Sequence, residues 1–333
     1  MNIQRWIARR EPSWKQLDSL LKHTEKRGFK ALRAEDIRNL SSLYRSVSSD
    51  LARARTHNVD DAVVQDLQML TSRAYSQVYQ GSRRQEINSL FDFVLWGFPA
   101  VVQETKVYTA IATALFFLGF AIAAWYAWRD PSFVALIAPE SLIRLVRDEG
   151  QLWMGSILGH EPEASSGIMV NNISVSLRAI FGGVTHPISI FPPIITPPGA
   201  FTIFLLFYNG VNIGAIAALV GQNNLALPFW AFVFPHGALE LPAIFFAGGA
   251  GLLLARGILF PGPLRRSDSL IYYGRQAAQL VFGIIPILFI AGIIEGFFSP
   301  SPLIPDPLKY LTGAIIFFFL VVYCRRQRPQ ANG

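Results

Sequence analysis

The sequence predicts an all-α, polytopic membrane protein with about six transmembrane helices, an N-terminal helical domain and an interfacial helix before the first crossing. Hydrophobic residues make up 52% of the 333 residues and charged residues only 15%, against about 25% charged in a typical soluble domain. The mean hydropathy is +0.35. Residues 1–106 hold 17 of the 29 Lys and Arg residues and 12 of the 22 Asp and Glu residues. A charged head is therefore followed by an apolar body.

The net charge of +7 is concentrated in the head, where no basic stripe interleaved with aromatic residues accompanies it. An anionic lipid surface accounts for such a charge, so we expect membrane lipids and no nucleic acid among the partners. The first 30 residues contain Arg5, Arg9, Arg10 and Lys15 but no apolar core, which excludes a signal peptide there. Cys324 is the only cysteine, so no internal disulfide can form.

Residues 1–85 are expected to form a cytoplasmic domain of three amphipathic helices. Apolar residues recur there at spacings of three and four, which gives each helix one apolar face. The three sets are Trp14, Leu17, Leu20 and Leu21; Ile37, Leu40, Tyr44, Val47 and Leu51; and Val63, Leu67, Leu70, Ala74 and Val78. Three such helices can bury a small core against each other.

The apolar body begins with residues 86–104, which are expected to lie in the headgroup layer as an amphipathic helix. The transmembrane domain follows over 105–325, and 326–333 forms a cytoplasmic tail. Each crossing needs about 20 mainly apolar residues. The six expected crossings lie at about 107–128, 168–190, 200–220, 229–255, 277–298 and 309–324. The second is the weakest, because polar residues interrupt it.

Positive charge indicates the orientation, since cytoplasmic connections are enriched in Lys and Arg. Arginines gather after the fourth crossing and in the tail: Arg256, Arg265, Arg266, Arg275, Arg325, Arg326 and Arg328. Residues 129–167 instead hold three arginines against six acidic residues. Six crossings therefore place both termini in the cytoplasm and 129–167 outside. Five prolines in 185–199 interrupt any helix there, which leaves a shallow interfacial loop or a shielded re-entrant segment.

Polar side chains occur inside four of the six expected crossings, beside small residues. His236 and Glu240 are four residues apart and share one helix face with Gly251. We expect a polar cluster of Asn171, Asn172, Arg178, Asn209, Asn212, His236, Glu240 and Glu295, with Gly182, Gly210, Gly237, Gly251 and Gly296 as helix-packing glycines. Arg178 is the expected counter-charge, because an unpaired ion at mid-membrane costs about 2.5–3.5 kcal/mol on insertion scales.

Three uses of this cluster compete. It can be a structural network that fixes the helix register, or part of a proton or cation pathway, which intramembrane carboxylates often mark. Intramembrane catalysis is the weakest option, because the HEXXH motif is absent and one histidine is too few for a typical zinc site. We therefore expect no catalytic residue, no cofactor and no metal site, with an intramembrane hydrolase as a third option only.

Four blocks of the sequence resemble, in order, the motifs of the stage II sporulation protein M family. They are VNNISVSLRAIFGG, YNGVNIGA, FPHGALELPAIFFAGGAGLLLA and IAGIIEGFFSPS. The resemblance covers roughly 105–325, and the matching positions are Asn171, Asn172, Asn209, Gly210, His236, Gly237, Glu240, Glu295 and Gly296. It implies a multipass membrane protein and, for the sporulating member, recruitment and organisation of peptidoglycan-degrading enzymes during engulfment. The helical head is a departure from that member.

Together these observations predict an integral scaffold of the bacterial inner (cytoplasmic) membrane that recruits or organises partner proteins in cell-envelope or peptidoglycan remodelling. The expected partners are cell-wall hydrolases or their regulators, and a second copy of the chain. The alternative is a proton- or cation-coupled transporter or channel for small solutes that uses His236, Glu240 and Glu295.

Overall fold

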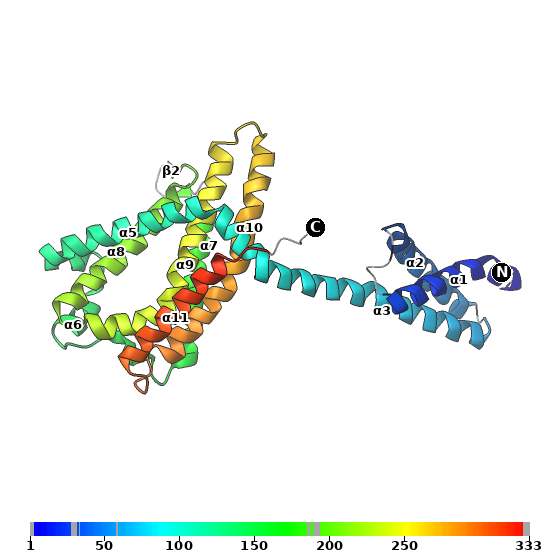
Figure 1. The fold of residues 1–333 in the computed structure, drawn as a ribbon, viewed down its shortest axis with the longest axis horizontal. Helices are drawn as coiled ribbons and strands as arrows, with labels where there is room; N and C mark the ends of the chain where they lie inside the picture. Colours follow the sequence, from blue (N-terminus) through cyan, green and yellow to red (C-terminus); the bar gives the residue numbers. More distant parts are fainter. Residues whose placement is uncertain are drawn as a thin grey trace. The chain divides into compact units, whose positions relative to one another are not determined.

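The structure is a computed structural model that describes residues 3–27, 32, 34–57, 59–184, 187–188 and 194–328. It is built almost entirely from helices (Figure 1). The chain divides into two units, Met1–Phe93 and Val94–Gly333. The predicted all-α membrane class is confirmed.

The described residues of the N-terminal unit form three helices, α1 (Ile3–Arg27), α2 (Ala34–Thr56) and α3 (Asp61–Asp92). Its core contains the residues that the apolar spacing predicts, among them Leu17, Leu40 and Leu67, all at most 1% exposed. Ile37 differs, because 37% of it is exposed. The side chain of Val78 lies outside the described residues. Arg73 of α3 binds carboxylates of α1, with Nη1 2.7 Å from Asp18 Oδ1 and Nη2 3.0 Å from Glu25 Oε2.

A buried polar network joins α1 to α2. Asp50 is 2% exposed, and its carboxylate accepts hydrogen bonds from Arg10 Nε at 2.8 Å and from Trp14 Nε1 at 2.9 Å. Arg10 also donates to the Ser46 hydroxyl. The buried carboxylate is thus paired and hydrogen-bonded, as a charge in a core requires.

The segment 86–104 is divided among three elements. No proline interrupts α3 before Asp92; a π-helical turn, η2 (Phe93–Gly97), and a short helix, α4 (Phe98–Glu104), follow. Pro99 stands in the first turn of α4, where its missing N–H leaves no intrahelical bond unmade. Phe98 is 1% exposed, and its ring packs where a Cβ on Gly283 would otherwise lie. The helix α4 therefore packs against the transmembrane bundle.

The described part of the membrane unit contains six long helices: α5 (Lys106–Arg129), α7 (Glu161–Phe181), α8 (Ala200–Gln222), α9 (Ala226–Leu259), α10 (Arg266–Ile293) and α11 (Asp306–Cys324). A π-helical turn, η5 (Ile294–Phe298), extends α10. Among the described residues, five helices are long and apolar enough to cross a membrane: α5, α8, α9, α10 with η5, and α11. Apolar side chains cover their outer surfaces, such as Phe282 at 69% and Phe318 at 61% exposure, as lipid contact requires.

Two of the connections between these helices contain short helices or strands. Between α5 and α7, the cap segment (residues 131–157) contains η3 (Pro131–Leu136), α6 (Glu140–Arg147) and η4 (Trp153–Ile157). Between α7 and α8, the two-residue strands β1 (Pro187–Ile188) and β2 (Ile194–Ile195) pair in antiparallel register. The expectation of a re-entrant or interfacial 185–199 falls largely on 185–186 and 189–193, which lie outside the described residues.

The helices α5 and α8 lie side by side and run parallel (Figure 1). A Cβ on Gly210 would overlap the Phe116 carbonyl, one on Gly214 the Phe120 carbonyl, and one on Gly221 would approach Trp128. In successive contacting pairs, the residue numbers increase along both helices, so α5 and α8 run in the same direction. Because the parallel helices α5 and α8 begin at the same end of the bundle, the chain must cross back to that end after α5. The helix α7 lies between them in the sequence and makes this return.

The helix ends alternate between two ends of the bundle. At the tail end, where α5 begins, Gln103 Nε2 donates to the Cys324 carbonyl at 3.0 Å, so α11 finishes there. At the cap end, where α5 finishes, Tyr310 donates to the Leu227 carbonyl at 2.8 Å, so α9 and α11 begin there. The helix α7 has 21 residues, about 31 Å at 1.5 Å per residue. Because of its polar residues, α7 is not among the helices that are apolar enough to cross a membrane. The sixth crossing therefore stays a prediction.

Candidate functional site

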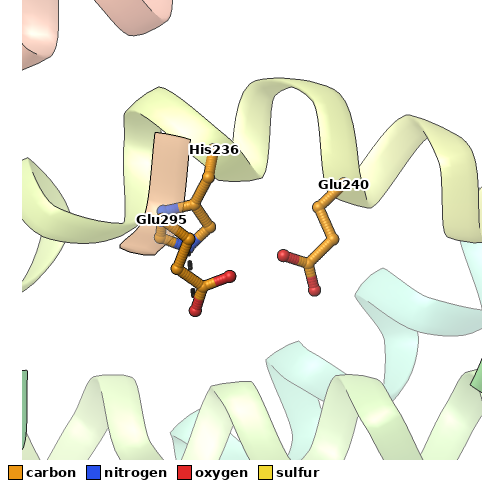
Figure 2. A group of neighbouring side chains, drawn as sticks. All are labelled: His236, Glu240 and Glu295. Atoms are coloured by element: carbon orange, nitrogen blue, oxygen red, sulfur yellow. Dashed lines mark ion pairs between the residues drawn. The ribbon is translucent and has the colours of Figure 1, made fainter. Parts of the chain in front are cut away.

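Three ionisable side chains meet near the cap end of the bundle. His236 and Glu240 come from neighbouring turns of α9, and Glu295 comes from η5; Figure 2 shows the Glu240 carboxylate turned toward that of Glu295. One nitrogen or oxygen atom from each residue lies within 4.8 Å of the others. These three side chains are called the His–Glu–Glu cluster below.

His236 is held by contacts on both ring nitrogens. It is 4% exposed, Nδ1 lies 3.1 Å from Ser299 Oγ, and Nε2 lies 3.7 Å from Glu295 Oε1. The ring also packs edge-on against Phe232, with 5.2 Å between the centroids. A hydroxyl can donate or accept, so Ser299 supports either neutral tautomer of the ring.

The backbone of η5 positions both Glu295 and Ser299. The Ser299 N–H donates to the Ile294 carbonyl at 2.8 Å, an i to i−5 bond that defines the wider π-helical turn. Gly296 lies against Ser165 of α7, where a Cβ would overlap the serine. Ser165 Oγ in turn donates to the Gly292 carbonyl at 2.8 Å. This close contact between α7 and α10 fixes the turn that carries Glu295.

Glu240 receives its hydrogen bond from a third helix. The side chain of buried Asn172, in α7, bonds to the Glu240 carboxylate. Asn172 Oδ1 accepts a hydrogen bond from Asn171 Nδ2 at 3.3 Å. The Asn172 amide therefore orients the Glu240 carboxylate without neutralising its charge.

Glu295 lacks comparable support. Its side chain is 15% exposed, and Oε2 is shielded from solvent without a hydrogen-bond partner among the described residues. Apart from His236, no cationic side chain in the described part of the chain forms an ion pair with either glutamate. Two carboxylates thus lie close together in an apolar bundle, where a proton or a bound cation must offset their charge.

The expected eight-residue polar cluster is only partly assembled. Arg178 is exposed and lies six residues, about 9 Å of helix, beyond Asn172. It pairs with neither glutamate, so the predicted counter-charge is wrong. Asn209 and Asn212 each donate at 2.7 Å to the carbonyl four residues earlier in α8. An asparagine that satisfies its amide on its own helix needs no partner on another one.

Four of the five predicted packing glycines make close helix contacts. Gly251 lies against the Ala179 carbonyl and the Thr202 side chain, and Gly182 against the Thr202 backbone. Gly210 and Gly296 approach α5 and α7 as described above. Gly237 differs, since a Cβ there would meet only Val233 Cγ1 of its own helix, at 3.4 Å.

In the described part of the chain, two cavities are lined by residues outside the cluster. One of about 400 Å³ is lined in the N-terminal unit by Trp6, Arg9, Arg10, Ser46, Ser49, Asp50 and Arg53. One of about 480 Å³ is lined by Val102 and by Lys106, Thr109, Ala110, Thr113 and Ala114 of α5. Neither includes a residue of the His–Glu–Glu cluster.

A comparison with known protein families identifies the family of this chain. The model of Stage II sporulation protein M matches residues 112–300, more than half of the chain. The chain belongs to the stage II sporulation protein M family. This match includes α7 to η5 and hence the whole His–Glu–Glu cluster with Asn172 and Ser299. A second model, a domain of unknown function (DUF8413), matches residues 4–80 in the N-terminal unit.

A curated relative matches part of the chain. An uncharacterized protein of Methanocaldococcus jannaschii, MJ0706, is 26% identical over 101 residues. The matched residues make up 29% of this chain and 45% of that protein, so less than half of the relative is covered. No solved structure matches the chain.

Ser299 was missed by the reasoning from sequence. It follows Glu295 by four residues, the same spacing that places His236 and Glu240 on one face. That spacing, together with its position at the end of the expected fifth crossing, was the available signal. The specific role of Asn172 as the partner of Glu240 could not be separated from that of Asn171, because adjacent residues point to different faces of a helix whose rotation is unknown.

Proposed function

We propose that this family member is an integral membrane scaffold that recruits or organises partner proteins in cell-envelope or peptidoglycan remodelling. The observation that carries the proposal is the cap segment, a folded surface seated on the cap end of the helical bundle. The resemblance to the sporulation member, whose role is to organise peptidoglycan-degrading enzymes, supports the same class of partner.

The cap segment is anchored by a small core of its own. Val134, Ile143, Val146 and Met154 are at most 8% exposed and pack with Phe229 and other residues of α8 and α9. Between these anchors, α6 turns its charged residues to solvent: Glu140, Arg144 and Arg147 are exposed. A rigid helix with an exposed charged face loses little conformational freedom when a partner binds it.

The arginine distribution supports an orientation for this scaffold. The end of α9, the start of α10 and the end of α11 lie at the tail end, and Arg256, Arg265, Arg266, Arg325 and Arg326 lie in or next to these segments. Cytoplasmic connections are the ones enriched in such residues. In this orientation the cap segment faces outward, where peptidoglycan enzymes act.

A photo-crosslinker at Arg144 in the native membrane tests the scaffold. We expect a discrete crosslinked product that contains a cell-wall hydrolase or one of its regulators, and we expect Arg147→Glu to reduce its yield at least about fivefold, since charge complementarity directs encounter. A crosslinker at lipid-facing Phe318, which is 61% exposed, is the matched control and is expected to yield no such product. Equal products from both positions, or none from Arg144, would reject the scaffold.

A transporter or channel is the second candidate, favoured by the unpartnered oxygen of Glu295. Proteoliposomes separate the two functions. The scaffold predicts that proton and cation flux through the wild type equals flux through Glu240→Gln and Glu295→Gln. A wild-type flux that falls at least about tenfold in both variants, but not in Asn209→Ala, would replace the scaffold with a transport function, because intramembrane carboxylates then carry the ion.

A further inference from the structure

We propose that His236, Glu240 and Glu295 together bind one divalent transition-metal ion, with Zn²⁺ as the best-suited ion, and that the ion fastens α9 to η5. The ligands are His236 Nε2, one carboxylate oxygen of Glu240, and both carboxylate oxygens of Glu295. The inference does not depend on the scaffold function, since it concerns only how two segments of the bundle are joined.

The spacing of the ligand atoms fits a single ion. In four-coordinate zinc sites with bonds of about 2.0–2.1 Å, neighbouring ligand atoms lie about 3.3 Å apart. His236 Nε2 and Glu295 Oε1 are 3.7 Å apart, and all three ligand atoms lie within 4.8 Å of one another. Small rotations of two glutamate side chains, with the imidazole held in place, complete this arrangement.

Each of two ligands already has the outer partner that metal sites use. A metal-bound histidine donates its other N–H to a neighbouring oxygen, which fixes the tautomer. Ser299 Oγ, 3.1 Å from His236 Nδ1, is that oxygen here. The Glu240 carboxylate is likewise oriented by Asn172. These contacts leave Nε2 and the carboxylate oxygens facing one another (Figure 2).

The third ligand supplies an independent observation. Glu295 Oε2 is inaccessible to solvent and has no hydrogen-bond partner in the described part of the chain. Buried carboxylate oxygens are ordinarily satisfied. An ion bound between the three ligands satisfies this oxygen directly. A divalent ion also offsets two carboxylate charges, which no Lys or Arg of the described residues pairs with.

The donor types select the ion. One imidazole nitrogen with two carboxylates suits Zn²⁺ and its first-row neighbours, whereas Ca²⁺ and Mg²⁺ prefer oxygen ligands alone. Thiolate ligation is excluded, because Cys324 is the only cysteine and its carbonyl contacts Gln103 at the opposite, tail end of the bundle.

The test uses the full chain, purified in detergent with an affinity tag that contains no histidine. After treatment with a chelator, the protein is reloaded with Zn²⁺ or Co²⁺ and freed of excess metal. We expect one Zn²⁺ per chain by elemental analysis and visible Co²⁺ absorption bands that Zn²⁺ displaces. His236→Gln and Glu295→Gln are expected to lose both signals. His160→Gln and Glu163→Gln, which alter exposed residues, are expected to retain them.

Two further measurements keep the proposal testable if a variant does not fold. X-ray absorption of the zinc-loaded wild type should show only nitrogen and oxygen ligands at about 2.0–2.1 Å, with the scattering of a single imidazole. Zn²⁺ should also raise the wild-type melting temperature by about 5 °C at saturating concentration. No stoichiometric metal, equal binding by all four variants, or a spectrum with two imidazoles would overturn the proposed site and leave only loose surface binding.

Discussion

Replacing Gly251 by valine is expected to lower the melting temperature of the membrane unit by about 4–10 °C, the size of an overpacking defect in a domain of this length. Even the first added carbon at this position would overlap the Ala179 carbonyl of α7 and approach the Thr202 side chain of α8. The carbonyl belongs to helix backbone and cannot rotate aside, so α7 must move away from α9. Thermal unfolding in detergent, followed by tryptophan fluorescence, measures the change.

Gly237→Ala is the matched control, because it adds a methyl group in the same helix. The only atom near this methyl would be Val233 Cγ1, at an ordinary contact distance of 3.4 Å. Since glycine in a helix interior is less favourable than alanine by about 1 kcal/mol, this variant should be neutral or slightly stabilised. A Gly251→Val variant as stable as the wild type would contradict the described contact between α7 and α9.

Replacing Asp50 by alanine is expected to destabilise the N-terminal unit by about 2–3 kcal/mol, the range for hydrogen bonds to a buried charged group. The substitution leaves Arg10 Nε and Trp14 Nε1 without their acceptor. Arg10 is 28% exposed in its side chain, so water recovers part of the loss. Hydrogen exchange of α1–α3 peptides in the full chain should accelerate about 30- to 100-fold.

Two variants make this prediction specific. Glu11→Ala breaks the exposed pair with Lys15, in which both side chains are at least 47% exposed, and should change stability by less than about 1 kcal/mol. Asp50→Asn keeps one oxygen acceptor and should fall between the wild type and Asp50→Ala. Equal exchange in Asp50→Ala and Glu11→Ala would show that the network does not stabilise the unit.

The helices were predictable where one physical signal dominated. The apolar runs of α5, α8, α9, α10 and α11 exceed the length that a bilayer requires, so composition alone located them. The helix α7 was harder, because Asn172, Ser165 and Ser176 are buried by neighbouring helices and lower its apolar content. The continuation of α3 through Asp92 was also missed, since no residue type separates a long surface helix from a helix in the headgroup layer.

The three ionisable residues of the candidate site were predictable from the sequence, whereas their surrounding partners were not. The spacing of four between His236 and Glu240 placed both on one helix face, and Glu295 fell inside another expected crossing. Arg178 was expected to join the same cluster as Asn171, but rotation of α7 exposes both residues to the outside and turns Asn172 inward. Rotation depends on packing by several neighbours, such as Gly292 and Gly296 against α7, which a single sequence does not specify.

Aromatic side chains connect the surface proposed for docking to the interior histidine. Trp153 of the cap segment contacts the Phe229 ring, with centroids 5.8 Å apart, and one turn further along α9 the Phe232 ring touches His236. The segment proposed to dock a partner and the interior histidine therefore pack against neighbouring turns of one helix. Docking at the cap segment and occupation of the His–Glu–Glu cluster would thus act on the same stretch of α9.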